Sequence, residues 1–383
     1  MDGRWNVVNS GGTHRIVVTK DLPGDQWLEI LENSQCRIDV CQSRQVLSPD
    51  ELRDAIGDEC AGVIGQLTEY WNKELFGALA RAGGRVYSNY AVGYDNVDVE
   101  TASARGIAVG NTPGVLTETT AELAVALTFA ATRRIVEADD YMRSGQYDGW
   151  LPDLFLGELL WRKTLGVVGA GRIGTAYARM MVEGHRMNLI YVDVAPNNQL
   201  EAEVVQFNSY LESIGEQPVR CTHADDIDSL LAGADVVSLH PALTEDTYHL
   251  ISGERLARMK ENAILVNASR GAVIDEAALV EHCTRHPQFR VGLDVYENEP
   301  EMAPGLAELD NVVVAPHIGS ATRWTRNGMA ILAARNIIGI LHNYPIWNQE
   351  EMSAFLHPDA PAVTPSIINR EALELPVFPN LSG

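Results

Sequence analysis

The sequence predicts an α/β protein with two domains, each built on a mostly parallel sheet. Apolar strand-like segments alternate with amphipathic helix-like segments along most of the chain, which is typical of parallel sheets covered by helices. At 383 residues the chain exceeds what one compact core usually holds. A glycine-rich turn between a strand and a helix lies in the middle of the chain, where a second domain is expected to begin.

Residues 1–115 form the first predicted domain. Its strand-like segments are His14–Lys20, Arg37–Cys41, Gly62–Gly65, Arg85–Asn89 and Ile107–Gly110. Its helix-like segments lie between them, at Asp25–Glu32, Pro49–Ile56, Asn72–Arg81 and Val97–Ala104. This alternation predicts one small parallel-sheet domain.

One long helix is predicted from Gly114 to Ser144. The segment is rich in Ala and Leu and has Thr and Glu near its start. A helix between two α/β units is expected to connect them and to lie in an interface. The apolar loop that follows, which we expect to pack against a partner subunit, contains Trp150, Leu154, Phe155, Leu156 and Trp161.

The second domain is expected to contain a dinucleotide site. A strand at Thr164–Val168 runs into Gly169-Ala170-Gly171-Arg172-Ile173-Gly174 and then into a helical stretch. Gly169 permits the turn, Gly171 lets the backbone approach a pyrophosphate, and Gly174 lets the helix pack close to the strand. The N–H groups at the helix N-terminus can bind the phosphates. The pattern predicts a Rossmann-type domain.

The next strand ends at an acidic residue that favours one cofactor. Asn188–Val192 is followed by Asp193, about 20 residues beyond the last glycine, as a dinucleotide site requires. The carboxylate can accept hydrogen bonds from the adenosine ribose and would repel a 2′-phosphate. Because no Arg or Lys follows in residues 194–198, NAD(H) is favoured over NADP(H).

The rest of the second domain continues the same alternation, after an insertion at Pro196–Pro218 that we interpret as irregular. Further strands are predicted at Asp235–Leu239, Ala263–Val266, Arg290–Gly292 and Val312–Val314. Helix-like segments between them include Ile227–Leu231, Gly253–Met259 and Glu276–Cys283. This is the pattern of a complete doubly wound domain.

The end of the chain is expected to return to the first domain. Ala321–Leu341 is helix-like, and the tail from Pro358 is rich in proline and irregular. Too little sequence remains for a third domain. The predicted domains are therefore 1–115 together with 320–383, and 116–319.

Composition excludes several classes of partner. The 29 basic and 52 acidic side chains give a formal net charge of −23, which repels nucleic acid and anionic membranes. No apolar run reaches the roughly 18 residues of a membrane span, and the start of the chain lacks the apolar core of a secretory signal. Five scattered cysteines without a C-x-x-C pair favour a reducing, cytoplasmic location.

A metal site is not expected. His282, Cys283 and His286 could place ligands on one helix face. No carboxylate or second cysteine completes a tetrahedral set, so a partly exposed helix is the favoured interpretation.

Arg270, Glu299 and His317 each follow a strand of the second domain, at the end where open α/β sheets bind ligands. A guanidinium can bind a carboxylate and polarise an adjacent carbonyl. A histidine can protonate an alkoxide, and a neighbouring carboxylate favours its charged form. Singly, each residue could be an ordinary loop side chain. Their shared location beside a nicotinamide predicts reduction of a carbonyl.

A series of motifs also matches one enzyme family. They lie at Gly62–Glu69, Ala91–Glu100, Gly106–Ala124, Gly169–Gly184, Met187–Asp193, Asn267–His282, Phe289–Pro300 and Pro316–Thr322. In these motifs the chain resembles the D-isomer-specific 2-hydroxyacid dehydrogenases, and most of all the plant photorespiratory, NADH-dependent hydroxypyruvate reductases. The resemblance implies a Rossmann NAD-binding domain, a discontinuous flavodoxin-like substrate domain, and a homodimer made through the long helix and the Trp150 region.

The resemblance also implies residue roles. Arg270 would orient the substrate, His317 would donate the proton, and Glu299, rather than Glu297, would pair with His317. Residues expected to contact the cofactor are Gly169, Gly171, Arg172, Ile173, Gly174, Asp193, Pro241, Ala268, Arg270 and Asp294. Residues expected to bind the substrate are Leu67, Val92, Gly93, Arg270, His317 and Ser320.

The implied activity is reduction of hydroxypyruvate to D-glycerate, with glyoxylate as a poorer substrate, in photorespiratory or serine and glycerate metabolism. Glyoxylate reductase and phosphoglycerate dehydrogenase are alternatives within the family. An NAD-sensing corepressor is the alternative from another class. Plant members commonly end in the peroxisomal signal Ser-Lys-Leu, whereas this sequence ends Asn380-Leu381-Ser382-Gly383, so the cytoplasm is the expected location.

Overall fold

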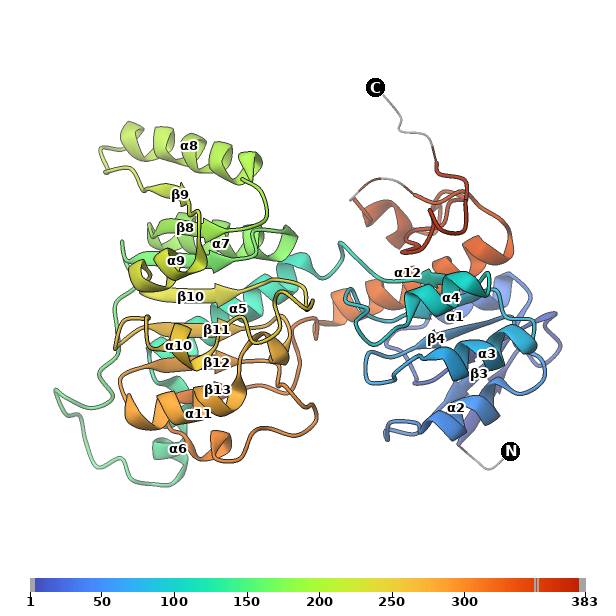
Figure 1. The fold of residues 1–383 in the computed structure, drawn as a ribbon, viewed down its shortest axis with the longest axis horizontal. Helices are drawn as coiled ribbons and strands as arrows, with labels where there is room; N and C mark the ends of the chain where they lie inside the picture. Colours follow the sequence, from blue (N-terminus) through green and yellow to red (C-terminus); the bar gives the residue numbers. More distant parts are fainter. Residues whose placement is uncertain (1–3, 348, 350, 379–383) are drawn as a thin grey trace. The chain divides into compact units, whose positions relative to one another are not determined.

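The structure, a computed structural model, describes residues 4–347, 349 and 351–378. The chain divides into two compact units (Figure 1). Unit 1 consists of Met1–Leu116 and Ala321–Gly383, and unit 2 of Thr117–Ser320. The expected boundaries, after residues 115 and 319, each lie one residue away. The C-terminal residues Asn380-Leu381-Ser382-Gly383, which were compared with the Ser-Lys-Leu signal, lie outside the described residues.

Unit 1 is built on a six-stranded sheet in the order β1-β3-β2-β4-β5-β6. The strands are β1 (Trp5–Val8), β2 (His14–Val18), β3 (Cys36–Cys41), β4 (Gly62–Gly65), β5 (Val86–Asn89) and β6 (Ala108–Gly110). Edge strand β1 is antiparallel to β3, and every other neighbouring pair is parallel. The parallel strands follow the flavodoxin-like order 2-1-3-4-5, as predicted.

Helices cover both faces of this sheet (Figure 1). They are α1 (Gln26–Asn33), α2 (Pro49–Ile56), α3 (Lys73–Arg81), α4 (Val99–Ala104) and α12 (Arg323–Leu341). Residues of α2, α3 and α4 share one apolar cluster with Val17 and Val63 of the sheet. Helix α12 packs against α1 and against β4 and β5. It has buried residues on all sides, so a helix from the far end of the sequence completes the core of unit 1.

The segment after α12 is anchored to unit 1. It contains η3 (Ser353–Leu356), and Ile367 forms an antiparallel bridge with Gly110. The side chain of Asn369 accepts from the backbone N–H of Val109 at 2.8 Å and donates to the carbonyl of Ile107 at 2.9 Å. The tail predicted to be irregular therefore extends the edge of the sheet at β6.

Unit 2 is built on a seven-stranded parallel sheet in the order β13-β12-β11-β10-β7-β8-β9. The strands are β7 (Thr164–Val168), β8 (Asn188–Val192), β9 (Cys221–His223), β10 (Val236–Leu239), β11 (Ile264–Asn267), β12 (Arg290–Leu293) and β13 (Val312–Val314). Successive strands are added on one side of β7, as β8 and β9, and then on its other side, from β10 to β13, so the order of strands reverses between β7 and β10. Such a switch point is where doubly wound sheets bind ligands.

The helices of unit 2 form two layers. Those that carry residues of one apolar cluster are α5 (Thr117–Thr132), α7 (Arg172–His185) and α8 (Asn198–Ser213). Those that carry residues of the other are α9 (Ile227–Gly233), α10 (Gly253–Leu256) and α11 (Glu276–Arg285). Short helices η1 (Gly271–Val273) and η2 (Leu306–Glu308) lie in loops. Strand residues alternate between the layers, because Leu165 and Val167 join the first cluster and Val168 the second.

The prediction of one helix from Gly114 to Ser144 was wrong. The segment forms α5, which ends at Thr132, and α6 (Ile135–Arg143). Arg134 interrupts them with a left-handed backbone, φ 54°. Its guanidinium pairs with Glu137 at 2.6 Å and lies 5.0 Å from the ring centre of Phe155. An ion pair with the first turn of α6 and a contact with the loop at Phe155 thus stabilise a backbone conformation that arginine rarely adopts.

The prediction of an irregular insertion at Pro196–Pro218 was also wrong. Helix α8 occupies most of it and is capped by Asn197, whose side chain accepts from the N–H of Leu200. Its buried residues, Leu200, Val204 and Leu211, lie along one face of an otherwise polar helix. The short edge strands β1 and β9 were not predicted either, since neither contains a fully buried side chain.

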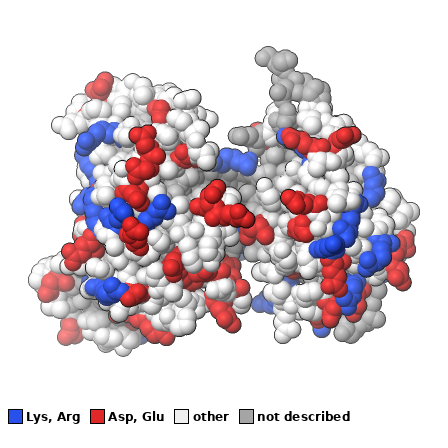
Figure 2. Space-filling model, viewed as in Figure 1, with Lys and Arg blue, Asp and Glu red and all other residues white. Residues whose placement is uncertain are grey.

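The surface agrees with the acidic composition. Acidic side chains are interspersed with basic ones on the face drawn in Figure 2. Among the described residues, no helix is long and apolar enough to cross a membrane. Nor do three His, Cys, Asp or Glu side chains of that part of the chain gather as metal ligands would.

Candidate functional site

His317 and Glu299 are in direct contact in unit 2. Nδ1 of His317 lies 2.8 Å from Oε2 of Glu299, and both side chains are partly exposed. Glu299 follows β12 and His317 follows β13, which are neighbouring parallel strands. His317 has a left-handed backbone, φ 53°, and its N–H donates to the carbonyl of Asp294 at 2.9 Å. The ring is therefore held through both its backbone and Nδ1.

The environment of Glu299 keeps its carboxyl group ionised. Burial acts to raise the pKa of Glu299, but the hydrogen bond and charge of His317, the N–H of Tyr296 and the charge of Arg270 outweigh it and lower the pKa. An ionised carboxylate only accepts hydrogen bonds, so Nδ1 of His317 carries a proton. This leaves Nε2 of His317 as the atom that can exchange a proton with a ligand.

Asp294 fastens the loop that follows His317. Its buried carboxylate accepts from the N–H groups of Ile318 and Gly319, both at 2.7 Å. Burial is the largest influence on Asp294 and raises its pKa, although these N–H groups oppose the change. The expected contact of Asp294 with a nicotinamide stays a prediction. Its contacts hold the backbone of residues 317–319, directly before Ser320.

Arg270 lies at the same edge of the sheet as the histidine–glutamate pair. It follows β11, and its positive charge contributes to the lowered pKa of Glu299. Nη1 of Arg270 donates to the carbonyl of Ser269 at 2.9 Å. Asn267 shapes this turn, because its Nδ2 donates to the carbonyl of Arg270 at 2.8 Å and its Oδ1 accepts from Ser269. Three neighbouring strands thus bring the predicted catalytic side chains of unit 2 together.

A second imidazole–carboxylate pair joins His249 to the loop that carries Glu299. Nε2 of His249 lies 2.7 Å from Oε1 of Glu297. The buried carboxylate of Glu276 accepts from the N–H of Glu297 at 2.9 Å and from the N–H of Ala303 at 3.1 Å. The loop is therefore fastened on both sides of Glu299. No sequence pattern pointed to His249, because it lies in an irregular segment with a left-handed backbone, φ 48°.

The glycine turn between β7 and α7 has the geometry that the motif predicts. Gly169 has φ 88°, and a Cβ there would lie 2.8 Å from the backbone N of Pro241. A Cβ on Gly174 would lie 2.0 Å from the carbonyl oxygen of Gly169. A Cβ on Gly171 would meet no atom within 4 Å, so this part of the turn is open. One glycine makes the turn, one permits close packing, and one leaves space for a ligand.

The start of α7 offers donors to that space. Gly171 is the residue before the helix and has no side chain to cap it. The first N–H groups of an α-helix, here from Arg172 and Ile173, have no partner within the helix and can donate to a phosphate. The residues present therefore fit the pyrophosphate of a dinucleotide.

The other predicted cofactor residues surround the switch point. Asp193 follows β8, Pro241 follows β10 and Ala268 follows β11. Gly169, after β7, lies directly against the backbone of His240 and Pro241. The ends of these strands thus frame one edge of the sheet in unit 2.

The predicted substrate residues fall in both units. Leu67 follows β4, and Val92 and Gly93 follow β5, which pairs with β4 in unit 1. Arg270, His317 and Ser320 belong to unit 2. Each group lies together within its own unit, and their joint action on one substrate stays a prediction.

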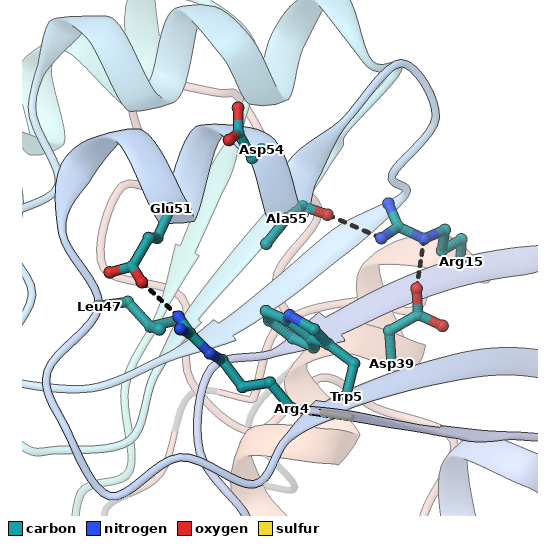
Figure 3. A pocket seen from close by; sticks show the side chains of 8 residues that line it. All are labelled: Arg4, Trp5, Arg15, Asp39, Leu47, Glu51, Asp54 and Ala55. Atoms are coloured by element: carbon teal, nitrogen blue, oxygen red, sulfur yellow. Dashed lines mark hydrogen bonds and ion pairs between the residues drawn. The ribbon is translucent and has the colours of Figure 1, made fainter. Parts of the chain in front are cut away.

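A pocket of about 320 Å³ lies elsewhere in unit 1 (Figure 3). Its lining residues are Arg4, Trp5, Arg15, Asp39, Leu47, Glu51, Asp54 and Ala55. Arg15 donates to Asp39 and to the carbonyl of Ala55, both at 2.7 Å, and Arg4 pairs with Glu51. Because these charged side chains pair with one another, the pocket is lined by ion pairs and hydrogen bonds that join the sheet of unit 1 to α2.

Comparison with known proteins places this architecture in a family. Residues 125–319 match the NAD-binding domain of the D-isomer specific 2-hydroxyacid dehydrogenases. The chain is 56% identical over 375 residues to a peroxisomal glycerate dehydrogenase of Arabidopsis thaliana, with 97% of each chain covered. It is 54% identical over 371 residues to a glycerate dehydrogenase of Cucumis sativus, covering 96% of this chain and 97% of the relative.

A solved structure has the same fold. The TT0316 protein from Thermus thermophilus is 35% identical and has a TM-score of 0.77, with 92% of this chain and 99% of that chain covered. The family match and the two relatives identify the class of protein as an NAD-binding dehydrogenase. The chain belongs to the D-isomer specific 2-hydroxyacid dehydrogenase family. The predicted fold class and family are thereby confirmed.

Proposed function

We propose that this enzyme reduces hydroxypyruvate to D-glycerate with NADH, and reduces glyoxylate to glycolate more weakly. The observation that carries the proposal is the 2.8 Å contact between His317 and Glu299, with Arg270 at the same sheet edge, in a member of this family. The relatives from Arabidopsis thaliana and Cucumis sativus are glycerate dehydrogenases, and oxidation of glycerate is the reverse of this reaction.

The side chains of unit 2 have distinct roles in this reaction. NADH, when bound, supplies a hydride to the C2 carbonyl carbon. Arg270 binds the substrate carboxylate and polarises the keto oxygen. His317 delivers a proton from Nε2 to the developing alkoxide, and Glu299 stabilises the imidazolium before the transfer. The neutral imidazole then regains a proton from solvent.

The preference for NADH over NADPH rests on Asp193. This carboxylate follows β8 and is not followed by Arg or Lys in residues 194–198. It can accept hydrogen bonds from the ribose hydroxyls, whereas a 2′-phosphate would bring negative charge against it.

The two units have separate tasks in the proposal. Unit 2, which contains the whole matched segment 125–319, binds the cofactor as the domain predicted at 116–319. Unit 1, with the loops at Leu67 and Val92, binds the substrate as the domain predicted at 1–115 and 320–383. The metabolic setting that fits is photorespiration or the interconversion of serine and glycerate.

A homodimer is also part of the proposal. Within one chain, α6 and the loop after it expose large apolar side chains, with Trp150 79% and Leu159 74% exposed. Other exposed side chains of this surface are Ile135, Met142, Leu151, Leu156 and Trp161. Such a surface favours burial against an identical copy about a two-fold axis. Light scattering coupled to size-exclusion chromatography should give twice the mass of the chain.

The expected cytoplasmic location is supported by the cysteines. All five are free, and four of them are buried. Thiols that form no disulfide suit a reducing compartment. Fluorescence microscopy of the chain tagged at an internal loop, with both ends free, tests this location against the peroxisome.

Initial rates of NADH oxidation test the reaction. We expect kcat/KM to be highest for hydroxypyruvate, lower for glyoxylate and lowest for 3-phosphohydroxypyruvate. A purified, folded chain that binds NADH but reduces none of these 2-keto acids would contradict the proposal and favour a sensing role. A preference for the phosphorylated substrate would instead assign it to phosphoglycerate metabolism.

A further inference from the structure

Three consecutive carbonyl groups in unit 1 are held by donors from neighbouring segments. The carbonyl of Ala91 accepts from the N–H of Thr112 at 2.9 Å. Nδ2 of Asn111 donates to the carbonyl of Val92 at 2.9 Å. The carbonyl of the next residue, Gly93, accepts from Nδ2 of Asn89, also at 2.9 Å. The orientation of each peptide group in this loop is therefore fixed from within unit 1.

Fixing these carbonyls also fixes the N–H groups that follow them. The carbonyl of one residue and the N–H of the next share one rigid plane. The planes held by Thr112 and Asn111 therefore set the directions of the N–H groups of Val92 and Gly93. In the part of the chain that the structure describes, neither N–H donates to a protein acceptor, and both residues are partly exposed. Two adjacent donors are thus oriented and left open.

The C-terminal segment sets the orientation of Asn111. A carbonyl oxygen only accepts hydrogen bonds, so Asn111 must turn Nδ2 toward Val92 and Oδ1 away from it. Oδ1 accepts from the hydroxyl of Ser366 at 2.6 Å. Ser366 is held in turn by Asn336 of α12, whose Oδ1 accepts from the N–H of Ser366 at 2.9 Å. Nδ2 of Asn336 donates to the carbonyl of Asn111 at 2.9 Å, which closes the network.

A second branch of this network reaches the turn at Leu67. Nδ2 of Asn89 also donates to Oδ1 of Asn96 at 3.1 Å. Nδ2 of Asn96 donates to the carbonyls of Gln66 at 3.2 Å and Glu69 at 2.9 Å. The side-chain amides of Asn89 and Asn96 thus fasten the loops after β4 and β5 to each other.

We propose that Asn111 is a positioning residue that holds the N–H group of Gly93 toward the substrate carboxylate, beside the N–H of Val92 that the bond from Thr112 orients, and that Ser366 keeps Asn111 in the required orientation. The proposal rests on the proposed function, because it assigns the open donors to a 2-keto acid. A carboxylate gains most from donors that are already oriented, since none of its binding energy is then used to order the loop. The C-terminal segment thereby contributes to substrate affinity without touching the substrate.

The alternative is that these amides only stabilise the fold. Asn369 provides a matched control, because it is also nearly buried and its side chain also bonds to backbone groups, those of Ile107 and Val109. Asn369 has no described bond to the loop at Val92. Asn111→Leu and Asn369→Leu each remove side-chain hydrogen bonds from unit 1 without adding charge. Only the first should release the carbonyl of Val92.

Steady-state kinetics with hydroxypyruvate and NADH test the proposal. We expect Asn111→Leu to raise the KM for hydroxypyruvate about tenfold, with kcat reduced less than about threefold, because the hydrogen bond that orients the N–H of Gly93 is lost. The dissociation constant of NADH should not change. Both substitutions should lower Tm by similar amounts, but Asn369→Leu should leave the KM for hydroxypyruvate unchanged. An equal rise of KM in both variants would overturn the proposal.

Ser366 provides a milder test that does not depend on the stability of Asn111→Leu. Ser366→Ala should raise the KM several-fold, and Ser366→Thr, which keeps the hydroxyl, should restore it. If Ser366→Ala has the KM of the unmodified enzyme, the positioning role is wrong. Calorimetric binding of oxalate to the NADH complex separates this failure from that of the proposed function. Suppose that Ser366→Ala binds oxalate more weakly than the unmodified enzyme does, and that the unmodified enzyme reduces no 2-keto acid. The carboxylate site would then be supported, and only the proposed reaction would be wrong.

Discussion

Glu297 and Glu299 lie two positions apart in one loop, and each carboxylate contacts a different imidazole. Glu299 contacts His317 at 2.8 Å, and Glu297 contacts His249 at 2.7 Å. Only the first pair lies at the strand ends together with Arg270. The second pair, with Glu276, fastens the loop itself. The two pairs should therefore differ in what their loss does to catalysis.

Replacing the two histidines should separate these roles. His317→Ala removes the proton donor, so kcat should fall by roughly 10²–10⁴-fold while NADH still binds. His249→Ala leaves the proton donor in place and loosens the loop, so kcat should fall only about tenfold or less. Stopped-flow and steady-state rates at saturating hydroxypyruvate measure both effects. Near-normal kcat in His317→Ala would contradict its assignment as proton donor.

Removing the negative charge of Glu299 should shift the pH profile of reduction. His317 lowers the pKa of Glu299, so the carboxylate is ionised at neutral pH and favours the imidazolium. Glu299→Gln removes the carboxylate that stabilises a positive charge on the ring. The decline of kcat on the alkaline side should therefore move to lower pH, in addition to a lower maximum. A profile of kcat against pH that keeps its alkaline midpoint would show that the pair does not act in proton transfer.

Asp193 should control the choice between the two nicotinamide cofactors. We expect the unmodified enzyme to have a higher kcat/KM with NADH than with NADPH. Asp193→Ala removes hydrogen bonds to the ribose and the repulsion of a 2′-phosphate. The ratio of kcat/KM with NADH to kcat/KM with NADPH should therefore fall by about tenfold. Asp226→Ala is the control, because it also removes a carboxylate from unit 2, one that caps α9. It should leave the cofactor preference unchanged. Equal rates with both cofactors before substitution would refute the argument from Asp193.

The glycines of the turn should separate stability from cofactor affinity. A Cβ on Gly174 would lie 2.0 Å from the carbonyl oxygen of Gly169, so Gly174→Ala should cost about 2 kcal/mol and lower Tm by roughly 4–8 °C. Gly171→Ala has open space in the turn and should keep Tm. Its methyl group should weaken NADH binding, because it lies where the pyrophosphate approaches. Thermal denaturation and NADH fluorescence titration measure the two effects, and a loss of both properties in Gly171→Ala would contradict this division.

Much of the fold follows from local sequence patterns. The strand Thr164–Val168 and the helix Pro49–Ile56 were predicted with their observed bounds, because apolar runs and capping residues mark their ends. The break at Arg134 could not be predicted, since it depends on Glu137 and Phe155 rather than on a glycine or proline. Helix α8 was missed because its few apolar residues are widely spaced in a polar segment.

The candidate site was predictable only where strand ends define it. Arg270, Glu299 and His317 each follow a strand, so their common edge could be inferred from the order of elements. The supporting contacts of His249 and Asn111 could not, because their partners Glu297 and Ser366 are distant in sequence. No local pattern encodes such pairs. They appear only when the chain is folded.

The discontinuity of unit 1 has a consequence for synthesis on the ribosome. Residues 1–116 emerge first, yet their sheet lacks α12 until almost the whole chain has been made. Unit 2 is continuous and is complete before α12 appears. The middle of the chain can therefore fold while the beginning still exposes the apolar surface that α12 will cover, which is the condition under which chaperones bind nascent chains. The order of folding in the cell is expected to run opposite to the order of the two units along the sequence.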